Sequence, residues 1–496
     1  MCGIYGIIGA NALRYPDVVD EMGAALRHRG PDGHAVLTHP HARIGTERLR
    51  IIDLHERADQ PFASPDNSVW LEANGEIYNA AEIRARYKDY PFRSKSDVES
   101  ILPLYLEHGV RAVEQLDGMF GLAIWDDRTR TLILARDRAG EKPLFYADVK
   151  GEILFASELQ CLLRHPDVPR DLDRLAIDQY LALGYVPEPR TPFTAIRRVP
   201  AGTLMRFEDG REQSYRYWNP EAFVIQPRTA KDAIAETERL IENAVSKQVM
   251  SDVPVGVFIS GGLDSSLLAT LASKKIGVDK VHTFSAQFAE ESYDESADAA
   301  LLAQHMRTKH VPVRADEETL LEALRHVTTR VAEPLADPAI LPTFLLARTA
   351  REHVKVILSG EGADELFGGY PTYLGHKIAP LYDAMPAFAR AALRKLAYAL
   401  PSSGKKVTIE YLLKKFVSDA ERPWIERHLR WFGTGLPATS LPDIEVSGED
   451  ALTGAMLLDY RSYLRDNLLV KVDRATMLSS VEARAPYLDR YLTAFA

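Results

Sequence analysis

The sequence is poor in cysteine: Cys2 and Cys161 are its two cysteines among 496 residues. Two cysteines cannot build the disulfide framework of a secreted domain, so a reducing compartment, the cytoplasm, is expected. No apolar run approaches the roughly 18 residues that span a bilayer, and we expect no membrane partner. The apolar stretch of residues 4–13 has no preceding Lys or Arg, so it does not predict a signal peptide.

Charge of one sign is also concentrated nowhere in the sequence. Sixty Lys and Arg against 70 Asp and Glu give a formal net charge of −10, without a long run of either sign. Nucleic-acid binding proteins usually carry a concentrated basic patch, so we expect no nucleic-acid partner. Gly and Pro occur 30 and 29 times, an ordinary share for a globular protein. At about 100–200 residues per domain, the length predicts two to four domains.

The first part of the chain is typical of an antiparallel α+β domain. Short β-type runs alternate there with polar turns, and helical patterns cover residues 17–26 and 98–116. The strand-like runs are residues 69–73, 120–125, 131–135 and 153–155. Strands with segregated helices predict layered antiparallel sheets. A further hairpin is predicted over residues 203–218, turning at Glu208-Asp209-Gly210.

The second part has a different pattern, which begins after prolines that cluster between residues 165 and 227. We place the domains at residues 1–218 and 228–496. A predicted helix over residues 230–250 leads into alternating strands and helices. The strands are residues 255–259, 281–286 and 354–358, and the helices are 265–275 and 297–306. This alternation predicts βαβ units and a parallel sheet, with ligands at the carboxyl ends of its strands.

The first candidate catalytic residue is Cys2, in the sequence Met1-Cys2-Gly3-Ile4. Removal of Met1 would leave Cys2 with a free α-amino group, whose ordinary pKa near 7.7–8 makes it a usable general base. A thiol that carries its own base needs no separate histidine. The alternative is an inert buried cysteine, which is the usual state of a free cysteine.

Four polar motifs in the first half supply partners for such a nucleophile. They are residues 27–33 (RHRGPDG), 48–53 (RLRIID), 74–79 (NGEIYN) and 96–97 (SD). An amide-cleaving cysteine needs an oxyanion hole, which the Asn74 side chain and the Gly75 backbone N–H would supply. An amino-acid substrate needs a cation and an anion, for which Arg48 and Asp97 are candidates. Taken singly, each residue also fits a turn or a surface ion pair.

These motifs resemble the class II glutamine amidotransferases, whose N-terminal-nucleophile domain begins Met-Cys-Gly-Ile. The resemblance continues through LDGMFG (116–121), RDRAGEKPLFY (136–146) and ASE (156–158), in order along the first domain. It implies that Cys2 is the nucleophile and that Asn74 and Gly75 form the oxyanion hole. The glutamine-binding residues that it implies are Arg48, Leu49, Arg50, Ile51, Ile52, Asn74, Gly75, Glu76 and Asp97.

A glycine-rich run, SGGLDSS at residues 260–266, follows the predicted strand 255–259. Its glycines let the backbone approach a phosphate, and Ser265 and Ser266 begin a helix whose N-terminus favours anions. Asp264 is placed to bind Mg²⁺ on the same phosphates. The alternative is an ordinary glycine turn; a Walker A loop is excluded because no Gly-Lys-Ser/Thr follows. The run resembles the SGGxDS loop of enzymes that cleave ATP to AMP and pyrophosphate.

Three carboxylates stand close together in SGEGADELFGGY, residues 359–370, directly after the predicted strand 354–358. Glu361, Asp364 and Glu365 repel one another unless a cation or a developing positive charge lies beside them. The alternative is an acidic surface turn. Beside an adenylating loop, such a carboxylate can deprotonate an attacking ammonia or bind Mg²⁺.

Together the motifs resemble the glutamine-hydrolysing asparagine synthetases, with further matches in SYDES (292–296) and KVDRATMLSSVEARAPYLD (471–489). The resemblance implies an α+β N-terminal-nucleophile glutaminase domain of layered antiparallel sheets. An α/β ATP pyrophosphatase domain of the adenine-nucleotide α-hydrolase type would follow. It implies catalysis by Glu361 and Mg²⁺ at Asp264 and Asp364. The implied ATP contacts are Ile259, Ser260, Gly261, Gly262, Asp264, Ser265, Ala286, Ser359 and Gly360.

Two departures from that family stand out. Ala286 replaces a larger aliphatic residue of many relatives. The family also continues well beyond residues 485–489 and carries there a lysine that helps adenylation, whereas this chain ends at Ala496. Lys471 does not match that lysine. We therefore expect either a truncated chain or another residue in the place of the lysine.

The resemblance implies an enzyme that hydrolyses glutamine at Cys2 and activates a carboxylate with ATP. Ammonia would pass between the domains, and aspartate is the expected acceptor, giving asparagine. The alternatives are another acceptor, such as a sugar acid, a peptide or a secondary metabolite, and a non-catalytic module that senses glutamine or nucleotide. A tRNA-modifying pyrophosphatase would need a basic face. The motifs leave the oligomeric state open, a homodimer included.

Overall fold

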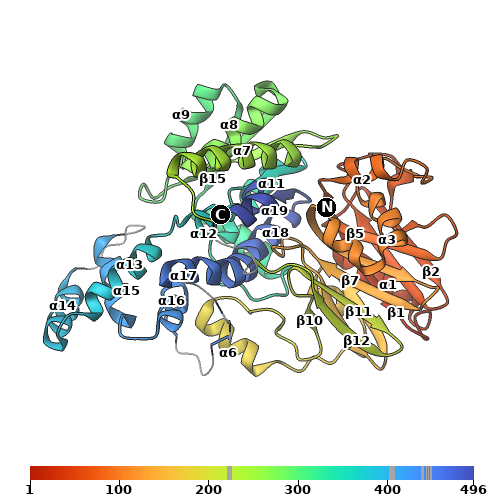
Figure 1. The fold of residues 1–496 in the computed structure, drawn as a ribbon, viewed down its shortest axis with the longest axis horizontal. Helices are drawn as coiled ribbons and strands as arrows, with labels where there is room; N and C mark the ends of the chain where they lie inside the picture. The colour runs from red at the N-terminus through yellow and green to blue at the C-terminus, as the bar shows by residue number, and fades with distance from the viewer. Residues whose placement is uncertain (221–225, 402–407, 437–440, 443, 445, 447–449) are drawn as a thin grey trace.

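A computed structural model describes residues 1–220, 226–401, 408–436, 441–442, 444, 446 and 450–496. The N-terminal sheets lie at one end of the molecule (Figure 1). A group of helices lies at the opposite end: α13 (Pro371–Asp383), α14 (Ala387–Ala399), α15 (Ile409–Asp419) and α16 (Trp424–Phe432). No helix in the described ranges is long and apolar enough to cross a membrane.

Two six-stranded antiparallel sheets make up the first part of the chain, as the strand patterns predict. The first has the order β10-β8-β9-β1-β3-β2 and the second the order β12-β11-β7-β6-β5-β4. The first sheet contains β1 (Cys2–Ile8), β2 (Gly33–His39), β3 (Ala42–Arg48), β8 (Phe145–Val149), β9 (Glu152–Ala156) and β10 (Arg197–Arg198). The second contains β4 (Phe62–Ala63), β5 (Val69–Ile77), β6 (Gly118–Asp126), β7 (Thr131–Arg136), β11 (Thr203–Glu208) and β12 (Arg211–Arg216).

The prediction of one continuous helix over residues 98–116 is wrong. Gly109 adopts φ +56°, a backbone conformation that favours glycine, and divides the segment. The pieces are η2 (Val98–Ser100), α3 (Ile101–His108), η3 (Gly109–Arg111) and α4 (Ala112–Gln115). The other helices of this part are α1 (Pro16–Leu26), η1 (Glu56–Ala58), α2 (Ala80–Arg86), α5 (Leu159–Leu162) and α6 (Arg174–Leu183).

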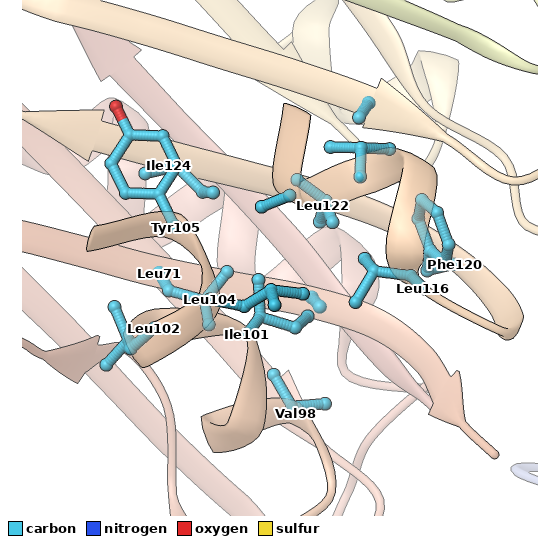
Figure 2. Packing of buried hydrophobic residues seen from close by; sticks show 14 of the residues in the cluster. Leu71, Val98, Ile101, Leu102, Leu104, Tyr105, Leu116, Phe120, Leu122 and Ile124 are labelled. Atoms are coloured by element: carbon cyan, nitrogen blue, oxygen red, sulfur yellow. The ribbon is translucent and has the colours of Figure 1, made fainter. Parts of the chain in front are cut away.

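A hydrophobic core lies between α3 and the second sheet. Leu104 and Ile101 from the helix pack with Leu71, Leu122 and Phe120 from the strands, and all five side chains are buried (Figure 2). Burial of large apolar side chains stabilises by about 1.5–3 kcal/mol each. This core therefore holds β5 firmly, and β5 carries the predicted oxyanion residues.

A five-stranded parallel sheet with the order β15-β14-β13-β16-β17 forms the centre of the second part. The strands are β13 (Val255–Phe258), β14 (Val281–Phe288), β15 (Lys309–Ala315), β16 (Val356–Leu358) and β17 (Glu482–Arg484). Together with the helices on it, this sheet confirms the predicted α/β fold. The two motifs after β13 and β16 lie at neighbouring carboxyl ends, because Val257 pairs with Leu358.

The helices of this part connect and cover the parallel sheet. The sheet-side helices are α7 (Ala230–Gln248), α8 (Leu263–Ile276), η5 (Val278–Lys280), α9 (Ser296–Met306), α10 (Glu317–Thr328), α11 (Ile340–Ala350) and α12 (Ala363–Phe367). The C-terminal ones are α17 (Ala451–Asp459), the π-helix η6 (Tyr460–Leu468), α18 (Leu469–Met477), η7 (Pro486–Leu488) and α19 (Arg490–Phe495). The strands β15 and β17 were not predicted.

Backbone hydrogen bonds join the two halves of the chain. The Ala336 N–H donates to the Gly184 carbonyl at 2.8 Å, and the Thr434 N–H donates to the Ala182 carbonyl at 2.9 Å. The end of α6 therefore packs on the second half. The domain limits 1–218 and 228–496 stay a prediction.

Candidate active sites

Cys2 begins β1, which lies between β9 and β3 in the first sheet. The residue is buried, and burial raises the pKa of its thiol. A thiol held in its protonated form needs a base beside it before it can attack. In the chain that retains Met1, the terminal ammonium group lies 2.6 Å from the Glu482 carboxylate. Until Met1 is removed, the free amine belongs to Met1, whereas the thiol belongs to Cys2.

Asn74 and Gly75 lie on β5, and Asn74 contacts Cys2 at the start of β1. The Asn74 Oδ1 accepts a hydrogen bond from the Cys2 N–H at 3.1 Å, while the buried Asn74 Nδ2 has no partner among the described residues. A Cβ at Gly75 would stand 2.0 Å from the Met119 carbonyl oxygen, so only glycine lets β6 approach so closely. An unpartnered amide donor next to a thiol is the arrangement that an oxyanion hole requires.

Asn74→Ala is expected to lower kcat for glutamine hydrolysis by about 10²-fold, because one oxyanion donor is lost. Ammonium-dependent pyrophosphate release should change less than twofold, since Asn74 lies outside the nucleotide pocket. Glutamate and pyrophosphate assays on the same preparation measure both rates. An unchanged kcat for glutamine hydrolysis would remove Asn74 from the catalytic set.

Two buried carboxyl groups, Glu76 and Asp97, lie in this site. Burial and the Asp97 charge raise the pKa of Glu76, and burial raises the pKa of Asp97. The Glu76 Oε2 accepts from Arg484 at 3.1 Å, but its Oε1 has no partner in the described structure. The Ile77 N–H donates to Asp97 at 2.7 Å. An ammonium group entering here would lower the cost of burying both charges.

The Arg48 guanidinium is already occupied by the neighbouring loop. Its two NH₂ groups donate to the carbonyls of Ile52 at 3.0 Å, Asp53 at 2.6 Å and His55 at 3.1 Å, and to Asp59 at 2.7 Å. In this structure Arg48 therefore stabilises the loop of residues 52–59, and both of its NH₂ groups are already engaged rather than free to bind a substrate carboxylate.

The next residues of the predicted glutamine-binding segment are also engaged. Arg50 pairs with Asp59 at 2.8 Å. Leu49 and Ile51 are buried in the hydrophobic cluster of the second half, with Leu240 and Val257. Their side chains anchor the loop across the boundary between the halves. The backbone is engaged as well, since the Leu49 N–H donates to the Met1 carbonyl and the Ile51 carbonyl accepts from the Asp252 N–H, each at 3.0 Å.

A cavity of about 400 Å³ opens at the carboxyl ends of β13 and β16. Nearly every residue predicted for ATP, Mg²⁺ and adenylation lines it: Ile259, Ser260, Gly262, Asp264, Ser265, Ala286, Ser359, Gly360, Glu361 and Asp364. Gly261 is not among the lining residues. It turns the loop instead with φ +81°, and a Cβ there would stand 2.6 Å from the Asp298 Cβ.

The loop before α8 is held by its own serines. The Ser260 N–H donates to Ser265 Oγ at 3.1 Å, and the Gly262 N–H donates to Ser260 Oγ at 3.2 Å. These bonds direct the N-terminus of α8 toward the cavity, where its unpaired N–H groups favour phosphate. The Tyr487 hydroxyl of η7 donates to the Asp264 carbonyl at 3.2 Å, which ties the start of α8 to the C-terminal segment.

Asp264 and Asp364 face each other across the cavity without an ion-pair partner among the described residues. Burial raises the pKa of both, and the Asp264 charge raises that of Asp364 further. The described residues contain no cluster of three metal-binding side chains. Mg²⁺ commonly takes one or two carboxylates with phosphate oxygens, so this pair fits the ion when ATP is bound.

The motifs did not assign Lys471 to this site, but the structure places it beside Glu361. Lys471 of α18 places its Nζ 3.9 Å from Glu361 and 3.5 Å from Asp337, and it is 8% exposed. Burial opposes its charge, yet Glu361 and Asp337 raise the pKa of Lys471. The lysine comes from a helix 110 positions after Glu361, which motif spacing could not show.

Sequence reasoning also missed the side chains of β17, although the VEAR motif contains them. The Arg484 Nε donates to Glu482 at 2.6 Å, and its NH₂ group donates to Glu76 at 3.1 Å. The Arg484 carbonyl accepts from the Ser359 N–H at 2.9 Å. The Lys142 Nζ donates to the Ala483 carbonyl at 3.0 Å. This three-residue strand contacts the residues of both candidate sites.

Comparison with known proteins agrees with this arrangement. The model of a glutamine amidotransferase domain matches residues 1–218, and that of an asparagine synthase matches residues 236–496. A Mycobacterium tuberculosis protein provisionally named asparagine synthetase (glutamine-hydrolyzing) is 34% identical, over 100% of this chain and 81% of its own length. Asparagine synthetase (glutamine-hydrolyzing) 1 of Bacillus subtilis is 30% identical, over 99% and 80%. Amidase chyE of Penicillium rubens is 29% identical, over 96% and 78%.

Proposed function

The chain belongs to the asparagine synthase family and carries a glutamine amidotransferase domain, and from this premise we propose that it converts aspartate to asparagine. Glutamine and ATP are the substrates of its two halves. Glutamine would supply ammonia at Cys2, and ATP would activate the acceptor carboxylate in the 400 Å³ cavity. AMP, pyrophosphate and glutamate would be the other products.

In the glutaminase half, the freed α-amine of Cys2 takes the thiol proton, and the sulfur attacks the amide carbon of glutamine. The Asn74 Nδ2 and the Gly75 N–H donate to the resulting oxyanion. The amine returns the proton to the leaving nitrogen, which departs as ammonia and leaves a thioester. Water then hydrolyses the thioester to glutamate and restores the thiol.

In the synthetase half, an oxygen of the acceptor carboxylate attacks the α-phosphorus of ATP and pyrophosphate leaves. Lys471 would stabilise the negative charge of the reacting groups, since its ammonium lies 3.9 Å from Glu361, which lines the cavity. Asp264 and Asp364 would hold Mg²⁺, which supplies charge neutralisation on the phosphates. Ammonia attacks the acyl-adenylate carbonyl, Glu361 accepts a proton from it, and AMP leaves.

The observation that carries this proposal is the joining of the two sites by β17. Glu482 lies against the chain terminus next to Cys2, and the Arg484 carbonyl binds the first residue of the Ser359–Gly360 turn. Ammonia must stay unprotonated and away from bulk water to remain a nucleophile. The burial of β17 supports a route for ammonia through the interior of the protein.

The acceptor is tested with a panel of carboxylic acids. Purified protein with ATP, Mg²⁺ and ammonium should release pyrophosphate with aspartate, and asparagine should accumulate in equal amount. The panel includes a sugar acid, a peptide with a free C-terminus and glutamate as the matched longer amino acid. Faster release with another acid, and none with aspartate, would replace aspartate while keeping the ligase chemistry.

A further inference from the structure

Arg29 is fully buried and contacts the nucleophile's own residue. Its Nε donates to the Cys2 carbonyl at 3.3 Å. That carbonyl points to the side of β1 where β9 pairs only from Tyr5 onward. Arg29 therefore takes the place of the missing strand partner and fixes the first peptide after Cys2.

The rest of the Arg29 guanidinium is held from the other half of the chain. Its NH₁ and NH₂ groups donate to the two carboxylate oxygens of Asp473, each at 2.8 Å, and NH₁ also donates to Glu158 at 2.6 Å. Such a bidentate pair fixes both position and orientation. Burial alone would raise the pKa of Asp473, but the Arg29 charge keeps it below its ordinary value. Asp473 is thus an anion that orients Arg29.

Asp473 lies on α18, two residues after Lys471. Two residues correspond to about 200° around a helix, so the two side chains leave α18 on opposite faces. Lys471 reaches Glu361 at the nucleotide cavity, and Asp473 reaches Arg29 behind Cys2. One helix therefore contributes to both candidate sites through separable side chains.

We propose that Asp473 is a positioning residue of the glutaminase reaction, supplied by the synthetase half and acting on Cys2 through Arg29. The inference rests on the proposed role of Cys2. A nucleophile displaced by about 1 Å can lose 10²-fold in rate, so the peptide that Arg29 holds matters to kcat. No hydrogen bond or ion pair joins Asp473 to Glu76 or Asp97, the carboxyl groups proposed to bind glutamine, so KM for glutamine should stay unchanged.

The test compares Asp473→Asn with wild type in the full-length protein. Asparagine keeps the size of the side chain, and Arg29 retains Glu158 as an anionic partner. We expect kcat for glutamine hydrolysis to fall about tenfold with KM unchanged, and ammonium-dependent pyrophosphate release to stay within twofold. Lys247→Met is the control, because Lys247 makes a different contact between the halves, with Asp117 at 2.8 Å. It should leave kcat unchanged.

A second variant separates positioning from general stability. Arg29→Lys keeps the charge but loses the bidentate geometry, and it should lower kcat for glutamine hydrolysis to a similar extent. Asp473 also accepts from the Arg474 NH₁ group at 2.6 Å, but Arg474 makes no contact with Cys2. Adding Asp473→Asn to Arg29→Lys should therefore produce no further loss of kcat for glutamine hydrolysis, since both changes act on the Arg29–Asp473 pair. Full additivity, or a wild-type kcat in Asp473→Asn, overturns the inference. An equal fall of pyrophosphate release also overturns it. A wild type that hydrolyses no glutamine would instead contradict the proposed function.

Discussion

Cys2→Ala is expected to lower glutamine hydrolysis by about 10⁴-fold or more, because no other described side chain at this site can form the thioester. Pyrophosphate release with ammonium, ATP and aspartate should stay within twofold of wild type. The thiol lies outside the nucleotide cavity, and ammonium replaces the product that the thiol would supply. Glutamate release and pyrophosphate release, measured on the same preparation, give both numbers.

Cys161→Ala is the matched control for this substitution. Its thiol is buried and donates to the Met22 carbonyl at 3.0 Å, away from Asn74 and Glu76. Loss of this thiol should leave both rates within twofold of wild type. If Cys2→Ala and wild type were equally inactive on glutamine, the first half would be the non-catalytic binding module that the motifs also allow.

The state of the N-terminus decides when this site becomes active. With Met1 in place, the terminal ammonium pairs with Glu482, and its charge with that of Arg484 lowers the pKa of that buried carboxyl to about 2, against the effect of burial. The amine is then paired with Glu482 of β17. Removal of Met1 leaves the amine on Cys2, whose N–H already binds Asn74. On the proposed mechanism, removal of Met1 would therefore create the base and start catalysis in one event.

The strands of both halves were predictable where period or flanking turns marked them. Residues 131–135 and 153–155 alternate with polar turns, and they lie in β7 and β9. The hairpin at Asp209 and Gly210 was visible because both residues suit positive φ, which they adopt. In contrast, β15 was missed although it has seven residues, and β17 has three residues without the apolar run that marked the equally short β16. The place of β17 in the sheet depends on pairing with β16, far away in the chain.

The residues of the candidate sites also fall into two groups, those placed by local sequence and those placed by packing between distant segments. Ser260, Asp264 and Glu361 follow strands directly, so their position at the sheet edge comes from local sequence. Arg48 lies beside Cys2 as expected, but motif position could not reveal that loop carbonyls occupy its guanidinium. Lys471 is placed by a helix that begins more than 100 residues after Glu361. Contacts of this kind follow from packing between distant segments.

Glu361→Gln is expected to lower steady-state pyrophosphate release by about 10³-fold, with ammonium or glutamine as the nitrogen source. The amide cannot accept the proton of attacking ammonia, and it removes the negative charge that lies 3.9 Å from Lys471. Lys471 would keep Asp337 at 3.5 Å, so the lysine should stay in place. Glutamine hydrolysis should change less than twofold, because Glu361 makes no contact with Cys2 or Asn74.

Glu352→Gln is the control for that variant, since Glu352 is exposed before β16 and does not line the cavity. It should retain both activities. Burial raises the pKa of Glu361 while Lys471 opposes that rise, so its charged form depends on the lysine. The Lys471→Met variant should therefore lose pyrophosphate release as Glu361→Gln does, and the double variant should lose little more. If Glu361→Gln lowered glutamine hydrolysis and pyrophosphate release equally, the division of the chemistry between two sites would be wrong.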